Sequence, residues 1–164
     1  MSHVLGELLY GKHAHTDSLA CVDVPADVAG QLPEWSAHSI WQLVWHMNFW
    51  MDHELKRIAG LPALYPEHAS LSWPIMTAPS TDTWRRELAR FGELLGRLAQ
   101  HAGESAEQLG RAVPATHGSE VEHASSLEAV LWQTIVHNSY HIGQVVVLRR
   151  ALGVWPPQSG SDTW

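Results

Sequence analysis

LEAVLWQTIVHNSYHIGQVVVLRRAL, residues 127–152, is the stretch that decides the fold. Its apolar residues recur every three or four positions, which predicts one long helix with a buried stripe. The stripe consists of Leu127, Val130, Leu131, Val145, Leu148 and Leu152. We expect a capping box of Ser125 and Glu128 to begin this helix and Gly153 to end it. The rest of the chain is organised around this element.

His137 and His141 lie four residues apart in this helix, on the flank of the apolar stripe. Side chains at that spacing point to the same side, one turn apart, so two imidazoles can share one metal ion. Twelve histidines in 164 residues produce roughly one such pair by chance. The pair alone therefore leaves two interpretations: core histidines that each hydrogen-bond to a neighbour, or two ligands of a metal site.

Helical periodicity extends over most of the remaining chain. We expect Gly11 to bend or interrupt the first helix and Ser36 to cap the second. No convincing alternating strand is found. These patterns predict an all-α protein, an up-down four-helix bundle that forms a single domain over residues 1–164. The predicted helices are 2–21, 37–59, 80–100 with a short continuation at 104–109, and 127–152.

The composition excludes several classes of partner. Ten basic against 17 acidic residues give a net charge of −7, which argues against nucleic acid or an anionic membrane as a partner. No stretch approaches the ~20 apolar residues of a membrane span, and the start of the sequence lacks a signal-peptide pattern.

The single cysteine, Cys21, excludes an internal disulfide and fits a reducing, cytoplasmic location. Nine tryptophans predict an aromatic-walled pocket or an interface.

The second predicted helix supplies a candidate third ligand. His46 lies at the edge of its apolar stripe and can face His137 and His141 across the core of a bundle. His53 lies on the same side, but about 10.5 Å further along the axis, so the two cannot readily bind one ion together. Glu54 falls inside the apolar stripe, where a carboxylate must find a partner.

Two stretches also resemble a known family. HSIWQLVWHM, residues 38–47, is similar to the second-helix signature of the DinB-like (YfiT-like) metal-binding four-helix proteins. HNSYHIGQ, residues 137–144, together with the LRR and GVWPP that follow, resembles the fourth-helix signature of that family. The resemblance covers most of the chain.

The resemblance implies a metal site and narrows the activity. It makes His46, His137 and His141 the ligands of a divalent transition metal, for which we expect zinc or nickel. The family includes homodimers and enzymes that transfer low-molecular-weight thiols such as bacillithiol and mycothiol. The resemblance therefore implies a small-molecule partner, such as a low-molecular-weight thiol substrate.

Four further residues are candidates for the surroundings of the site. Gln144, one turn beyond His141, can orient a ligand or a bound water, although a plain helix–helix hydrogen bond is an equal alternative. Trp45 and Trp50 are expected to wall a pocket, and Glu54 is a further polar candidate near it.

Three functions compete on these grounds. The first is a metal-dependent thiol S-transferase, the second a metal-dependent hydrolase, and the third a non-catalytic metal- or ligand-binding protein. No acidic residue is placed as an obvious general base, which weakens the hydrolase interpretation. A zincin protease would need Glu where Asn138 stands. A Glu-x-x-His at 120–123 is better interpreted as solvated loop than as half of a di-iron site.

The fourth helix has a second apolar side, formed by Trp132, Val136, Tyr140 and Val147. A helix that is apolar nearly all round is covered on both sides. The long connection at 60–79 is able to cover a site, and either loops or a second subunit can cover this helix. We expect a homodimer.

Overall fold

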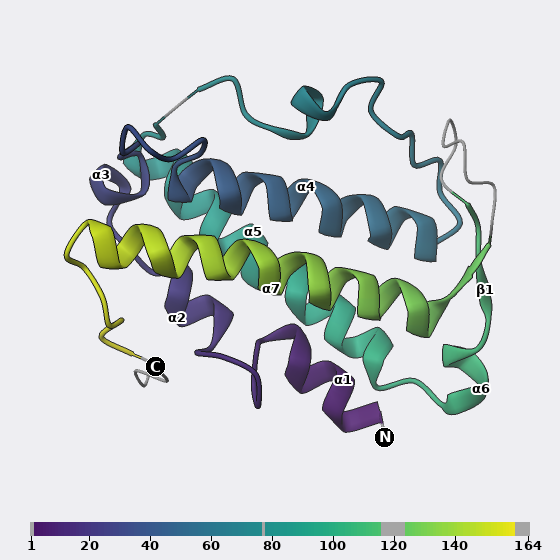
Figure 1. The fold of residues 1–164 in the computed structure, drawn as a ribbon. Helices are drawn as coiled ribbons and strands as arrows, with labels where there is room; N and C mark the ends of the chain where they lie inside the picture. Colours follow the sequence, from purple (N-terminus) through teal and green to yellow (C-terminus); the bar gives the residue numbers. More distant parts are fainter. Residues whose placement is uncertain (1, 77, 116–123, 160–164) are drawn as a thin grey trace.

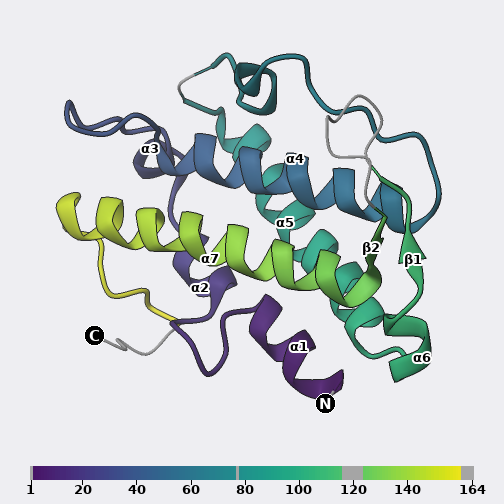
Figure 2. The ribbon, with the colours of Figure 1, turned by 45° about the vertical axis from the view of Figure 1, so that its right-hand side comes forward.

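Three long helices dominate the computed structural model, which describes residues 2–76, 78–115 and 124–159. They are α4 (Ile40–Ile58), α5 (Thr81–Ala102) and α7 (Leu127–Ala151). Helices α4 and α7 run side by side in opposite directions, and both pack against α5 (Figures 1 and 2). The all-α class predicted from the sequence is confirmed. The Glu-x-x-His at 120–123 lies outside the described residues.

The first predicted helix is divided into two short ones, α1 (Ser2–Leu9) and α2 (Ser18–Val22). Both pack against α5 and α7. The break occurs where Gly11 adopts a φ of +84°, a conformation that costs an ordinary residue free energy. Its backbone also lies so close to the His15 ring that a Cβ would fall 2.1 Å from it. The interruption expected at Gly11 is therefore found, and the continuous helix over 2–21 is not.

Two helix starts differ from the sequence prediction. Ser39, not Ser36, caps α4: its hydroxyl accepts from the Gln42 amide, and the Gln42 side chain accepts from the Ser39 amide. The cap of α7 is Ser126, not Ser125. A two-residue antiparallel pair that periodicity did not predict, β1 (Ala112–Val113) with β2 (Ser125–Ser126), leads into α7. The remaining short elements are α3 (Ala26–Ala29), η1 (Ala69–Ser72) and α6 (Ala106–Leu109).

Arg149 links α7 to α2 and to the segment that follows α7. Its guanidinium donates to the carbonyls of Ala20 and Cys21, each at 2.8 Å, and also to that of Val154. Burial raises the pKa of the Cys21 thiol to about 11, so this cysteine is protonated and unreactive at neutral pH. Both residues contribute to the fold and neither belongs to a reactive site.

The second apolar side of α7 is exposed. Its four residues, Trp132, Val136, Tyr140 and Val147, keep 44–68 % of their surface in contact with solvent. The described loops therefore do not cover this side, and the homodimer stays a prediction. None of the described helices is long and apolar enough to cross a membrane.

Candidate metal centre

Three imidazoles from two helices converge between α4 and α7. Nε2 of His137 lies 3.3 Å from Nε2 of His46 and 3.2 Å from Nε2 of His141. The candidate ligand atoms of all three lie within 4.8 Å of one another. His137 and His141 approach each other because they are one turn apart on α7, and His46 faces them because α4 lies alongside. The three residues picked out from the sequence are thus brought together.

The orientation of His46 is set by the connection at 59–80. Nδ1 of His46 lies 2.8 Å from the Ser72 carbonyl oxygen, which can only accept a hydrogen bond. Nδ1 must therefore carry the proton, which leaves the lone pair of neutral His46 on Nε2. That lone pair points to the other two rings. A carbonyl that fixes the tautomer in this way is the usual partner of a metal-binding histidine.

The distances fit a metal ion. A tetrahedral ion with zinc–nitrogen bonds of about 2.0–2.1 Å holds its ligand nitrogens about 3.3–3.4 Å apart. Hydrogen bonds alone account for the arrangement poorly. His46 Nε2 has no proton, so His137 Nε2 must either share one proton between both neighbours or accept from His141, which leaves no proton for its contact with His46. A cation, in contrast, accepts all three lone pairs at once, so these residues suit a divalent transition metal.

The three imidazoles are held neutral, as ligands must be. Burial lowers the pKa of His46 and of His141 to about 4. The Ser72 hydrogen bond raises the pKa of His46 in part, while the neighbouring histidines lower it. Burial also lowers the pKa of His137. At neutral pH no proton therefore competes strongly for this group.

A stack of three rings supports the site from the side of the long connection. Trp73 lies with one face against His46, at 3.9 Å between centroids and 8° between planes. Its other face lies against His38, at 3.6 Å and 4°. Trp50 completes the surroundings with its edge toward His46, at 6.3 Å. The ring of His46 is thus fixed by stacking as well as by its hydrogen bond.

The other candidates from the sequence are placed differently. Trp45 stacks on Phe49 and lines a separate pocket with His53, away from the triad. His53 is buried but does not belong to the converging group, as its position on the helix predicted. Glu54 forms an ion pair with Arg57 at 2.7 Å, which answers the need for a partner. These three positions form no part of the metal group.

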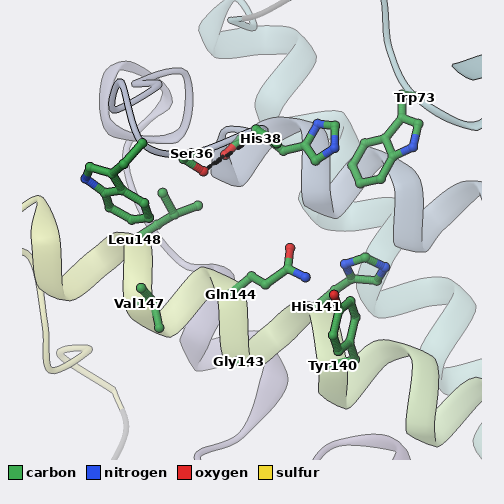
Figure 3. Close-up of a pocket in the computed structure, with 11 residues that line it drawn as sticks. Ser36, His38, Trp73, Tyr140, His141, Gly143, Gln144, Val147 and Leu148 are labelled. Carbon is green, nitrogen blue, oxygen red and sulfur yellow. Dashed lines mark hydrogen bonds between the residues drawn. The ribbon is translucent and has the colours of Figure 1, made fainter.

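Gln144 lies beside His141, and the interaction of its side chain with the imidazole raises the pKa of His141 against the effect of burial. Both residues line a pocket of ≈ 670 Å³ between α7 and the segment before α4 (Figure 3). We call it the aromatic pocket. Its lining consists of Trp35, Ser36, Ala37, His38, Trp73, Tyr140, His141, Gly143, Gln144, Val147 and Leu148. The pocket therefore leads to a ligand of the triad.

Sequence reasoning missed three residues that build the site. Ser72 and Trp73 come from the connection flagged only for its length, and His38 was noted only within the second-helix signature. These contacts join loop residues to residues of helices, and the helical period of a sequence does not predict such contacts. The one available signal was a tryptophan inside a long connection that was expected to cover a site.

Comparison with known proteins agrees with this description. The family model described as "DinB family" matches residues 18–161, which is most of the chain. No curated protein matches the sequence. The match begins at Ser18, the first residue of α2, and includes all three histidines of the triad. The chain belongs to the DinB family.

Proposed function

We propose that the protein holds a divalent transition metal, zinc or nickel, between His46, His137 and His141 and transfers a small thiol to a carbon electrophile. The observation that carries this proposal is the convergence of three imidazole nitrogens beside the aromatic pocket. Three protein ligands leave coordination positions for a substrate. His141 belongs both to the triad and to the pocket, so a ligand in the pocket has access to such a position.

The surroundings of the triad favour a substrate that brings its own nucleophile. None of the eleven described residues of the aromatic pocket is Asp or Glu, so no carboxylate base stands ready to activate water. When bound, the metal would lower the pKa of a coordinated thiol, which removes the need for such a base. The thiolate sulfur would then form a bond to carbon while the carbon–halide or carbon–oxygen bond of the electrophile breaks. An expelled halide leaves as the anion, and an opened epoxide takes up one proton.

The chain's own residues would orient the reactants. Ser72 keeps the lone pair of His46 on Nε2, and Trp73 holds the ring in its plane. Gln144, beside His141, is placed to hydrogen-bond to a group in the pocket. Trp35 and Tyr140 offer ring surfaces to the apolar part of an electrophile.

The test is to incubate metal-loaded protein with a panel of cellular thiols and either an aryl halide or an epoxide. Conjugation that needs both the thiol and the metal, and that disappears in His141→Ala, supports transfer. His53→Ala is the matched control, because that histidine is equally buried but outside the triad. Ester or amide cleavage without a thiol would favour a hydrolase. Silence in all assays, with metal bound, would favour a non-catalytic metal-binding protein.

A second copy of the chain is the proposed cover for the exposed side of α7. Trp132, Val136 and Val147 are the candidate interface residues, because they form an apolar side that no described loop covers. Val136 is 65 % exposed, so Val136→Glu should leave the monomer folded and separate a dimer. Sedimentation of the wild type as a monomer at micromolar concentration would refute the dimer.

A further inference from the structure

We infer that the part of the ligand that fills the aromatic pocket is an uncharged group with a flat ring. This inference rests on the proposed function and specifies which substrates the site accepts. It follows from what lines the pocket and from what is missing there among the described residues.

The pocket offers ring faces. Trp35 and Tyr140 contribute two large rings, and Val147 with Leu148 adds aliphatic surface, whereas the faces of Trp73 are covered by His38 and His46. Trp35 and Tyr140 come from different segments and are 61 % and 68 % exposed, so both rings are open to contact by a ligand. The volume of ≈ 670 Å³ lies within the range of small-molecule sites. A planar ring gains most from such walls because it contacts them over a whole face.

The pocket offers no charge to a remote ionic group. None of its eleven described lining residues is Asp, Glu, Lys or Arg. A carboxylate or sulfonate away from the metal would lose its hydration and find no cation in return. The net charge of −7 on the chain adds a general repulsion of anions. The metal itself favours one anionic donor atom, which the thiolate provides.

Polar contacts for an uncharged ligand are nevertheless present. Nδ1 of His38 is buried and has no hydrogen-bond partner among the described residues. Its burial closes this nitrogen to a ligand, so the accessible polar contact is the Gln144 amide. Figure 3 shows the Gln144 amide on the opposite side of the pocket from His38. The Gln144 amide suits hydroxyl, amide or carbonyl groups on the ring.

Another pocket lined by described residues has the opposite character. It is lined by Asp52, Lys56 and Arg90 beside its aromatic residues. Asp52 pairs with Lys56 at 2.8 Å and with Arg90 at 3.5 Å. Charged residues are therefore present around one cavity of this chain and missing from the described lining of the other. The lack of charged side chains is therefore specific to the described lining of the aromatic pocket and does not reflect the amino-acid composition of the whole chain.

The experiment uses two probes that differ only in charge. These are 4-(methylsulfonyl)benzyl mercaptan, which is neutral at the ring, and 4-(mercaptomethyl)benzenesulfonate, which has nearly the same shape but carries a remote negative charge. Their binding to metal-loaded protein is measured by titration calorimetry, together with that of the analogues without a thiol, methyl p-tolyl sulfone and p-toluenesulfonate. We expect the neutral thiol to bind at least tenfold more tightly than the anionic one.

Two variants place the same new cation on the same helix. Val147→Lys adds it at the pocket and should strengthen binding of the anionic thiol at least fivefold, with little change for the neutral one. Gln133→Lys adds it outside the pocket, at an exposed position that is not among the candidate interface residues, and should change neither. Equal affinity of the two thiols for the wild type, or equal effects of the two variants, would overturn the inference.

The pair of analogues without a thiol separates this inference from the proposed function. If the neutral analogue binds more tightly than the anionic one but the thiols bind no better than their analogues, the inference stands and thiol transfer fails. If the thiols bind well without regard to charge, thiol binding stands and the inference fails. If none of the four compounds binds, both fail.

Discussion

Helix α4 carries a buried imidazole in each half, and only one of them belongs to the metal group. His46 and His53 are 7 % and 5 % exposed, and burial lowers the pKa of each to about 4. Each also lies against Trp50, with ring centroids 6.3 and 5.3 Å away. By burial, pKa and aromatic surroundings the two histidines are nearly equivalent.

They differ in what their nitrogens face. His46 has one nitrogen on the Ser72 carbonyl and the other toward His137. His53 lies near Arg57 and Lys56, whose positive charges lower its pKa further and would repel a metal cation. A depressed pKa therefore identifies a buried histidine, and only the convergence of several unprotonated nitrogens identifies a ligand.

The largest expected effect is the loss of metal affinity when one histidine of the triad is removed. Changing His46, His137 or His141 to Ala removes one of three ligands and should weaken metal binding on the order of a thousandfold, about 4 kcal/mol. His53→Ala should leave the metal content nearly intact, because its ring lies outside the group. Elemental analysis of the purified variants measures the bound metal. A full complement in His46→Ala would refute the triad.

The next largest effect is a loss of folding stability when the buried ion pair near the C-terminal end of α4 is broken. Arg57 and Glu54 form an ion pair with side chains only 8 % and 10 % exposed, and Arg57 also donates to the Pro114 carbonyl. Arg57→Ala leaves Glu54 buried without its cation and should lower the free energy of unfolding by about 3 kcal/mol. Denaturant unfolding measures this, and the metal content of the folded variant should not change.

Lys56→Ala is the control for that prediction. Lys56 forms the exposed pair with Asp52, and its side chain is 50 % exposed, so its removal should cost less than about 1 kcal/mol. If Arg57→Ala were no more destabilising than Lys56→Ala, the far half of α4 would not depend on its buried ion pair.

Part of the difference between His46 and His53 could be predicted from the sequence, and part could not. Helical geometry places His137 and His141 on one side of a helix and lets His46 face them, and the resemblance to the DinB-like family implied that the three form one metal site. The separation of His46 from His53 follows from the rise per residue. Even the Glu54–Arg57 pair has the three-residue spacing of a helical ion pair, although it was not predicted.

What could not be predicted comes from the irregular segments. Ser72 reaches His46 across 26 positions of sequence, and Trp73 fits between two histidines that are eight residues apart. No period relates a loop to a helix, so these contacts depend on the tertiary structure alone. Trp45 was paired with Trp50 as a wall, yet only Trp50 is one turn from His46 and shares its side of the helix.

His46 and His53 should contribute similarly to the dependence of the unfolding free energy on pH. In metal-free protein both have a folded pKa of about 4 against 6.5 for a free imidazole. The unfolded chain therefore binds more protons between pH 6.5 and 4, and the folded state loses stability as the pH falls through that window. Each histidine contributes at most about 3 kcal/mol to this loss, and none of it above pH 6.5.

His46→Gln and His53→Gln test that prediction as a pair. Each should flatten the pH dependence of the unfolding free energy of metal-free protein by a similar amount, although only His46→Gln removes metal. Denaturant titrations between pH 4 and 8 measure both slopes. A wild-type stability that rises as the pH falls from 6.5 to 4 would contradict the assigned direction of the pKa shifts.

The smallest effect isolates the contribution of the long connection to His46. Trp73 contacts His46 over a whole ring face but cannot bind the metal itself, so Trp73→Ala removes support and leaves all three ligands. Loss of a residue that orients a ligand typically costs 10–100-fold in metal affinity, and we expect about tenfold here because the Ser72 hydrogen bond remains. Competition with a chromophoric chelator measures the affinity. Trp73→Phe, which keeps a stacking face, should recover most of it, and Trp45→Ala, which removes a half-buried tryptophan on the other side of α4, should have no effect. Wild-type affinity in Trp73→Ala would mean that the Ser72 carbonyl orients His46 without help from Trp73.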